Sequence, residues 1–211
     1  TYNDPVIFAE YAMDTARACQ PLGIKTVAVS AGYIHPAPRK AFFAMMDAAN
    51  IDLKAFTDDF YVHQTGSHLK PVLETLEYIA HETVCWLEIT TLLIPGLNDQ
   101  RVEIERESRW ILEHLGPEVP LHFSAFHPAW KMNDHPSTSP QTVELARRIA
   151  LDQGLKHVYT GNIHDLEGGK TVCAGCNATL IEREGYRVTT NRLLREGGCP
   201  DCGQILNGRF E

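Results

Sequence analysis

The strongest constraint on the fold of this chain is a regular alternation of helical and extended segments between residues 5 and 160. Val72, Leu76 and Ile79 recur at the spacing of one helix face, which predicts an amphipathic helix there. Prolines at positions 5, 38 and 140 stand where the first turn of a helix tolerates them. The predicted helices span residues 5–20, 38–50, 70–81, 100–115 and 140–153. The apolar runs between them are predicted strands, at residues 26–29, 51–53, 86–94, 121–126 and 158–160.

These apolar runs are mostly continuous, which is typical of strands buried on both faces. Repeated strand–helix order predicts a parallel sheet with right-handed crossovers. Five strands fit a barrel or part of one, and periodicity alone also allows a flat, doubly wound sheet. No Gly-x-Gly-x-x-Gly or phosphate loop follows a strand, which disfavours a dinucleotide-binding sheet. The expected fold class is therefore α/β, with a partial parallel barrel.

The composition changes after Gly161. Residues 162–211 are rich in glycine, hold four of the six cysteines and lack a long amphipathic stretch. We therefore expect two parts: residues 1–165 as the barrel, and residues 166–211 as a small four-cysteine, metal-binding tail. Because the turn at Pro5 leads straight into a helix, the chain is expected to begin inside a domain and the barrel to be N-terminally incomplete.

Composition excludes several classes of partner. The 211 residues are 44% hydrophobic, which is enough for one sizeable core with a small appendage. The net charge is −8 and no stretch collects Lys and Arg, so a nucleic-acid partner is not expected. The sequence holds no run of 18 apolar residues and no signal peptide, so we expect no membrane partner and a cytoplasmic location.

The cysteines are of two kinds. Cys19 and Cys85 stand alone among apolar neighbours and are predicted to be buried thiols. The other four form two Cys-x-x-Cys pairs, Cys173 with Cys176 and Cys199 with Cys202, which predict a metal site. Four thiolates suit a closed tetrahedral zinc site that staples the fold, and they can also hold iron, as one ion or as a cluster.

Polar residues at the ends of the predicted strands are the candidates for chemistry, because active sites of parallel α/β folds lie at the carboxyl ends of strands. Asp52 and Lys54 are two residues apart and share one strand face. Buried opposite charges are costly unless they pair or bind something. They can form a structural ion pair, or Lys54 can be a Schiff-base nucleophile.

The following strands also present polar groups. Glu88 and Thr90 share a face of the run at 86–94, and His127 ends the run at 121–126. Together with Asp52 and Lys54, Glu88 and His127 are expected to form one polar cluster at the mouth of the barrel. No residue is singled out as the catalytic one.

Five short motifs occur in the order expected for the glycyl-radical-activating branch of radical S-adenosylmethionine enzymes. They are TYNDP at 1–5, VSAGY at 29–33, DLK at 52–54, LIPGLND at 93–99 and SAFHP at 124–128. With the four-cysteine tail, the whole chain most resembles the radical S-adenosylmethionine enzymes of the AmmeMemoRadiSam system, related to pyruvate formate-lyase-activating enzyme.

The resemblance implies a cofactor-binding role for strand-end residues. Asn3 and Asp4 fall in the segment near the methionine amino group. Asp52 and Lys54 match the strand near the sulfonium and carboxylate, and His127 matches the histidine near the adenosyl moiety. Ser30 and Thr90 complete the predicted S-adenosylmethionine site.

The resemblance also implies the chemistry: a [4Fe–4S] cluster reductively cleaves S-adenosylmethionine to a 5′-deoxyadenosyl radical, which abstracts hydrogen from a protein or small-molecule substrate. The Cys-x3-Cys-x2-Cys motif that holds such a cluster is absent from the 211 residues. We expect it upstream, so the chain alone is expected to be an inactive fragment. Implied partners are a flavodoxin or ferredoxin as electron donor, and Memo-like or AMMECR-like companion proteins.

Two other functions stay open from the residues alone. One is a radical-free lyase or aldolase of the TIM-barrel type that uses Lys54. The other is a non-catalytic interaction module in which a zinc ribbon binds a partner and the barrel is a scaffold.

Overall fold

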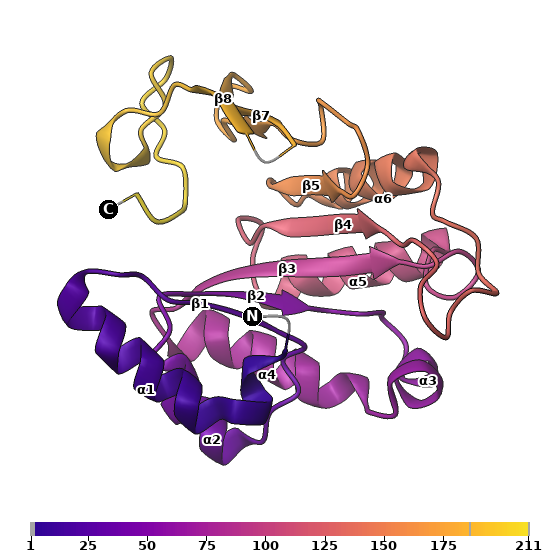
Figure 1. Ribbon diagram of the computed structural model, residues 1–211. Helices are drawn as coiled ribbons and strands as arrows, with labels where there is room; N and C mark the ends of the chain where they lie inside the picture. Colours follow the sequence, from indigo (N-terminus) through magenta and orange to yellow (C-terminus); the bar gives the residue numbers. More distant parts are fainter. Residues whose placement is uncertain (1–2, 186, 211) are drawn as a thin grey trace.

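The computed structural model describes residues 3–185 and 187–210 and contains two sheets. The strands of the larger sheet are β1 (Val27–Ser30), β2 (Ala48–Asp52), β3 (Trp86–Leu93), β4 (Leu121–Ala125) and β5 (Val158–Gly161). All neighbouring pairs are parallel, and the strands lie side by side in sequence order (Figure 1). Because a doubly wound sheet reverses its strand order part-way, the uninterrupted order confirms the partial-barrel type of winding.

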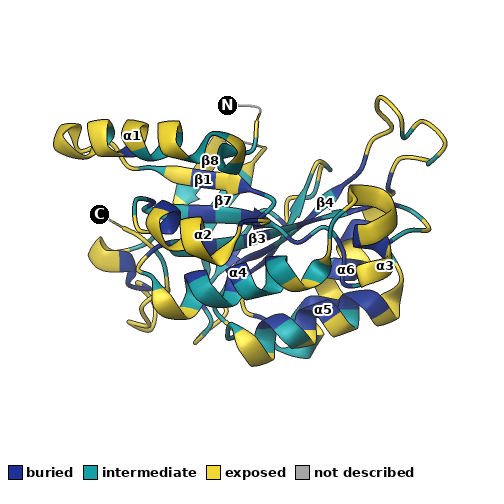
Figure 2. Cartoon of the chain, turned by 90° about the horizontal axis from the view of Figure 1, so that it is seen from below, coloured by how far each residue is buried: buried dark blue, intermediate teal, exposed yellow. Residues whose placement is uncertain are grey.

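Helices connect these strands. They are α1 (Ala9–Cys19), α2 (Pro36–Phe43), α3 (Asp58–Phe60), α4 (Leu69–Glu82), α5 (Arg101–His114) and α6 (Pro140–Gln153). Shorter helical turns are η1 (Pro5–Phe8), η2 (Gln20–Leu22), η3 (Tyr61–Thr65) and η4 (Arg195–Gly197). Figure 2 shows α4, α5 and α6 together on one side of the strands. The side chains of Ile51, Ile89 and Phe123 are fully buried beneath these helices.

The opposite face of the sheet is only half covered, so the prediction of strands buried on both faces is wrong. Residues of β3 alternate between buried and intermediate exposure, and Val27 and Val29 of β1 are 60% and 61% exposed. The strand register places Asn50, Glu88 and His122 on this less covered face. It is the concave face of an incomplete barrel, and we call it the open face.

The predicted helix at 38–50 is wrong in its second half. Helix α2 ends at Phe43, and residues 48–52 form β2 instead. The alanines there favour a helix by intrinsic propensity. Pairing with β1 on one side and β3 on the other outweighs that preference, because it satisfies backbone groups along both edges of the strand.

The C-terminal segment forms a three-stranded antiparallel sheet of β6 (Thr171–Val172), β7 (Thr179–Glu184) and β8 (Arg187–Asn191). Cys173, Leu180 and Cys199 are buried in a small separate cluster. In Figure 1 this segment runs from orange to yellow beyond β5. The predicted boundary at 165/166 falls in the connection between β5 and β6.

No helix in the described parts of the chain combines the length and the apolar character that crossing a membrane requires.

Candidate functional site

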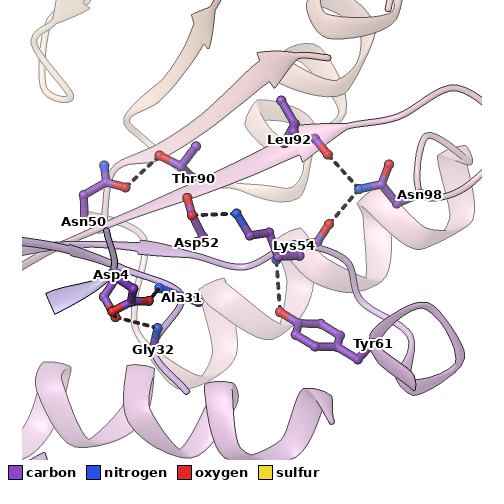
Figure 3. Close-up of polar contacts among 11 residues, drawn as sticks. Asp4, Ala31, Gly32, Asn50, Asp52, Lys54, Tyr61, Thr90, Leu92 and Asn98 are labelled. Atoms are coloured by element: carbon purple, nitrogen blue, oxygen red, sulfur yellow. Dashed lines mark hydrogen bonds and ion pairs between the residues drawn. The ribbon is translucent and has the colours of Figure 1, made fainter. Parts of the chain in front are cut away.

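Asp52 and Lys54 form an ion pair at the carboxyl end of β2. Lys54 Nζ lies 2.6 Å from Asp52 Oδ2, and the two side chains are about one-third exposed (Figure 3). The predicted proximity of these charges is confirmed. Because both remain reachable from solvent on the open face, a ligand that carries an ammonium and a carboxylate can exchange with either partner.

Asn98 holds the ends of β2 and β3 in register. Its Nδ2 donates to the carbonyl oxygens of Lys54 at 2.7 Å and Leu92 at 2.9 Å, and its Oδ1 accepts from Ile94 N at 2.7 Å. Tyr61 supports the same turn, since its hydroxyl accepts a hydrogen bond from Lys54 N at 3.0 Å. Asn98 was part of a motif noted in the sequence, but its positioning role is visible only in the structure.

The Asn98→Ala variant is expected to lose about 3 kcal/mol of unfolding free energy, because three backbone groups in a buried turn lose their partner. Urea unfolding checks this. The matched control, Asn207→Ala, removes an exposed amide and is expected to stay within about 0.5 kcal/mol of the parent protein. Equal stability of the two variants would contradict the positioning role of Asn98.

Asp4 fastens the N-terminal segment to the end of β1. Its Oδ1 accepts from Val6 N at 3.0 Å and from Ser30 Oγ at 2.9 Å, and its Oδ2 accepts from Ala31 N at 2.7 Å. The predicted ligands Asp4 and Ser30 are thus brought together with Asn3 beside them. In this structure both carboxylate oxygens of Asp4 accept hydrogen bonds from other residues of the chain.

Glycine is required at position 32 in the turn after β1. Its φ is +67°, and a side chain there would meet Ile51 Cγ2 at 2.8 Å. This close approach brings the β1 turn against β2, next to Asp52.

The remaining predicted ligands lie along the same edge. Thr90 is the register partner of Asp52, and its hydroxyl donates to Asn50 Oδ1 at 2.8 Å. Asn50 ends the helix predicted for residues 38–50 and is not among the predicted site residues. His127 is exposed and follows β4, so it lies beyond the same carboxyl edge.

Glu88 does not join the Asp52–Lys54 pair, contrary to the predicted four-residue mouth cluster. It lies two residues before Thr90 and contacts His122 of β4, with Glu88 Oε2 and His122 Nε2 2.8 Å apart. Trp86 Nε1 donates to its other oxygen at 3.1 Å. Burial alone would raise the pKa of Glu88, but the hydrogen bond and charge of His122 outweigh burial and lower that pKa. Glu88 is therefore a carboxylate at neutral pH.

The two Cys-x-x-Cys pairs fold into matching knuckles. Cys173 N donates to Ala178 O at 2.9 Å and its carbonyl accepts from Asn177 N at 2.9 Å. Cys199 makes the equivalent bonds with Gln204 O and Gly203 N, at 2.8 and 2.9 Å. Asn177 and Gly203, at equivalent places, both have positive φ. The chain therefore builds the same loop twice around one point.

The four sulfur atoms converge at that point. The Sγ–Sγ distances are 3.6 Å for Cys173–Cys202 and 3.7 Å for Cys176–Cys199, and all four sulfurs lie within 4.8 Å of one another. A tetrahedral ion with metal–sulfur bonds of ~2.3 Å requires sulfur–sulfur edges of about 3.8 Å. The geometry thus fits one tetrahedral metal ion.

The other two cysteines lie outside this group. Cys85 is buried as predicted, and burial raises the pKa of its thiol to about 12, which makes it unreactive. Cys19 is only partly buried, because α1 lies at the margin of the core.

Comparisons with known proteins give one sequence relative and several structural ones. An uncharacterized protein of Methanocaldococcus jannaschii is 38% identical over 208 residues, which cover 98% of this chain and 61% of the relative. The chain therefore spans about three-fifths of the length of this relative. No protein-family profile matches the chain.

Solved structures of other proteins share the fold of this chain. A domain of pyruvate-formate lyase-activating enzyme from Bacteroides vulgatus superposes with a TM-score of 0.66 at 17% identity, covering 77% of this chain and 96% of that one. A radical SAM methyltransferase from Sphaerobacter thermophilus has a TM-score of 0.60 at 15% identity, over 74% and 48% of the two chains. The chain therefore shares its α/β fold with a domain of an activating enzyme and with a radical SAM methyltransferase.

A third neighbour was solved with a bound ligand. SuiB of Streptococcus suis, solved bound to S-adenosylmethionine, has a TM-score of 0.56 at 11% identity, covering 72% of this chain and 36% of SuiB. At these identities the superpositions establish a shared α/β fold. The role of each residue has to be argued from the local geometry of this chain.

Proposed function

We propose that this chain is the main part of a radical S-adenosylmethionine enzyme of the glycyl-radical-activating type, related to the AmmeMemoRadiSam system. The observation that carries the proposal is the Asp52–Lys54 pair. It presents both charges to solvent, 2.6 Å apart, at the carboxyl edge of a singly wound parallel sheet. Neighbours with this fold include a protein bound to S-adenosylmethionine, which supports the assignment.

The pair fits a zwitterionic sulfonium ligand. Lys54 is suited to the methionine carboxylate, and Asp52 to the positive charges of the ammonium and sulfonium. Asn98 and Tyr61 orient the backbone of Lys54, and Thr90 and Asn50 border Asp52 on the open face. When bound, the cofactor and an iron–sulfur cluster supply the reductive bond cleavage and the hydrogen abstraction, while the chain contributes orientation, charge and exclusion of water.

The cluster ligands belong, in this proposal, to residues outside the 211, because the required Cys-x3-Cys-x2-Cys motif is not among them. The electron donor and the Memo-like or AMMECR-like companions stay predictions, as does the cytoplasmic location. The substrate is a hydrogen donor in a protein or small molecule.

We assign zinc to the four-cysteine site. A cubane cluster puts each thiolate on a different iron and so needs a wider spacing than sulfurs within 4.8 Å of one another. A closed four-thiolate site in short loops is typical of structural zinc. Metal analysis after anaerobic iron–sulfur reconstitution is expected to find one zinc and no iron per chain; one iron without sulfide, or four irons with matching sulfide, would refute it.

The function is tested in a protein in which the proposed cluster-binding segment precedes this chain, reconstituted anaerobically and reduced with dithionite. Formation of 5′-deoxyadenosine from S-adenosylmethionine is expected. Asp52→Asn and Lys54→Met each remove one charge at little change of volume, and should weaken S-adenosylmethionine binding at least tenfold by calorimetry. Lys25→Met, an exposed lysine before β1, is the matched control.

Unchanged binding in both variants would overturn the assignment of the pair. Borohydride trapping of a carbonyl substrate on Lys54, with no 5′-deoxyadenosine formed, would instead support the Schiff-base lyase.

A further inference from the structure

A cleft of about 1040 Å³ lies away from the Asp52–Lys54 pair, between the strands β3–β5 and the C-terminal segment. Its size is that of a small-molecule site. None of Asp4, Ser30, Asp52, Lys54 or His127 lines it. Glu88, on its wall, lies two residues before Thr90, or about 7 Å along the strand.

A chain of polar and aromatic contacts crosses this cleft from the sheet to the C-terminal segment. Glu88 bonds to His122, and the His122 ring stacks on Tyr159 with a centroid separation of 5.0 Å. The Tyr159 hydroxyl lies 2.9 Å from Thr171 Oγ1, which accepts a hydrogen bond from Arg183 Nη1 at 3.0 Å. The Arg183 guanidinium lies 5.8 Å from the centre of the Tyr159 ring.

The carboxylates that line the cleft are already engaged through both oxygens. Glu88 accepts from Trp86 and contacts His122. Asp165 accepts from Thr160 Oγ1 and from Glu167 N, each at 3.0 Å.

The guanidinium groups that line the cleft form no direct ion pair among the described residues, although the charge of Arg183 acts on Glu88 from a distance and contributes to lowering the pKa of that carboxyl group. Arg183 bonds through Nη1 only to neutral acceptors, Gly169 O and Thr171 Oγ1. Arg209 donates to a backbone carbonyl, that of Val84. Within residues 3–185 and 187–210, neither guanidinium has a carboxylate at ion-pair distance. Arg183 is half-buried, and a half-buried guanidinium without an anionic hydrogen-bond partner is costly. A bound oxyanion lowers that cost, because it accepts two parallel N–H hydrogen bonds from the guanidinium.

The cleft also has apolar and aromatic wall residues, beside polar ones such as His157 and Asn162. The apolar and aromatic ones include Trp86, Tyr159, Ile163, Ile181 and Phe210. We infer that this cleft is a binding site for a small organic oxyanion, a carboxylate or phosphate on an aromatic or apolar body, held by Arg183 and contacted by the ring of His122. In the described residues His122 Nδ1 has no hydrogen-bond partner, since Nε2 is the nitrogen that contacts Glu88.

The test uses the full chain and needs neither cluster nor S-adenosylmethionine, so its outcome is independent of the proposed function. Benzoate and phenyl phosphate are the probes, and benzamide is the neutral isostere; binding is followed by NMR titration. We expect at least one anion to bind tenfold or more tighter than benzamide. The tighter of the two anions identifies the ligand's charged group as carboxylate or phosphate.

The variant Arg183→Gln is expected to weaken anion binding at least tenfold. Arg187→Gln removes the same charge from an exposed position on the neighbouring strand β8, outside the cleft, and should bind like the parent protein. Should Arg183→Gln loosen the C-terminal segment, the comparison of the two anions with benzamide on the unmodified chain still decides. Binding of both anions no tighter than that of benzamide, equal weakening by Arg187→Gln, or no anion binding at 10 mM would each overturn the inference.

Discussion

Replacing Cys199 by serine, or removing the metal with a chelator, is expected to unfold the C-terminal segment from Thr171 to Phe210 while the parallel sheet stays folded. Among the described residues, the buried apolar core of this segment consists of Cys173, Leu180 and Cys199, with Ile181 and Leu193 packed against it. So small a core cannot balance the conformational entropy of forty residues. A structural zinc ion contributes ~10–16 kcal/mol of folding free energy in small domains. Loss of the ion therefore removes more folding free energy than this small core supplies.

Limited proteolysis measures this effect. Cleavage within residues 171–210 is expected to become at least tenfold faster in Cys199→Ser, with far-UV circular dichroism of the helices nearly unchanged. Cys19→Ser, which alters a partly buried thiol of α1 outside the four-sulfur group, is the matched control. Unchanged cleavage in Cys199→Ser would show that the four cysteines do not hold the segment together.

The second large effect concerns Glu107, whose carboxyl group is buried beneath β3. Only 2% of this residue is exposed, and Thr91 Oγ1 donates to its Oε1 at 2.5 Å. Burial raises the pKa of Glu107 to about 8, although the Thr91 hydrogen bond opposes this shift. Between the ordinary pKa of 4.5 and about 8, the folded state holds a proton that the unfolded state has lost.

The unfolding free energy is therefore expected to fall as the pH rises through this window, by about 1.4 kcal/mol for each pH unit. The contribution of Glu107 is fully present below pH 4.5 and is lost at about pH 8. Glu107→Gln keeps the shape and stays neutral, so it should match the parent protein near pH 5 and exceed its stability by several kcal/mol at pH 8. Urea unfolding at pH 5, 6, 7 and 8 measures this.

The exposed Glu113 lies on the same helix, α5, and supplies the control. Glu113→Gln is expected to keep the parent pH dependence. If Glu107→Gln kept it too, or were less stable at pH 8, Glu107 would not be a protonated buried acid.

The site could be predicted only in part, and the difference follows from sequence separation. Asp52 and Lys54 were found because residues two apart on a strand share a face. Glu88 and His122 are 34 residues apart, and their contact depends on which residues of β3 and β4 lie opposite each other. Periodicity identifies a strand but does not specify its register, so Glu88 was assigned to the wrong cluster.

By itself, the sequence determined the order of strands and helices, the residues 140–153 of α6, and the four cysteines that share one site. These features depend on local spacing, since amphipathic periods and short cysteine loops are properties of neighbouring residues. The tertiary structure alone decided that residues 48–52 pair as a strand, that one sheet face stays open, and that Arg183 meets Tyr159 across a cleft. These features depend on pairing and burial between distant segments, where the free energy of contacts outweighs local propensity.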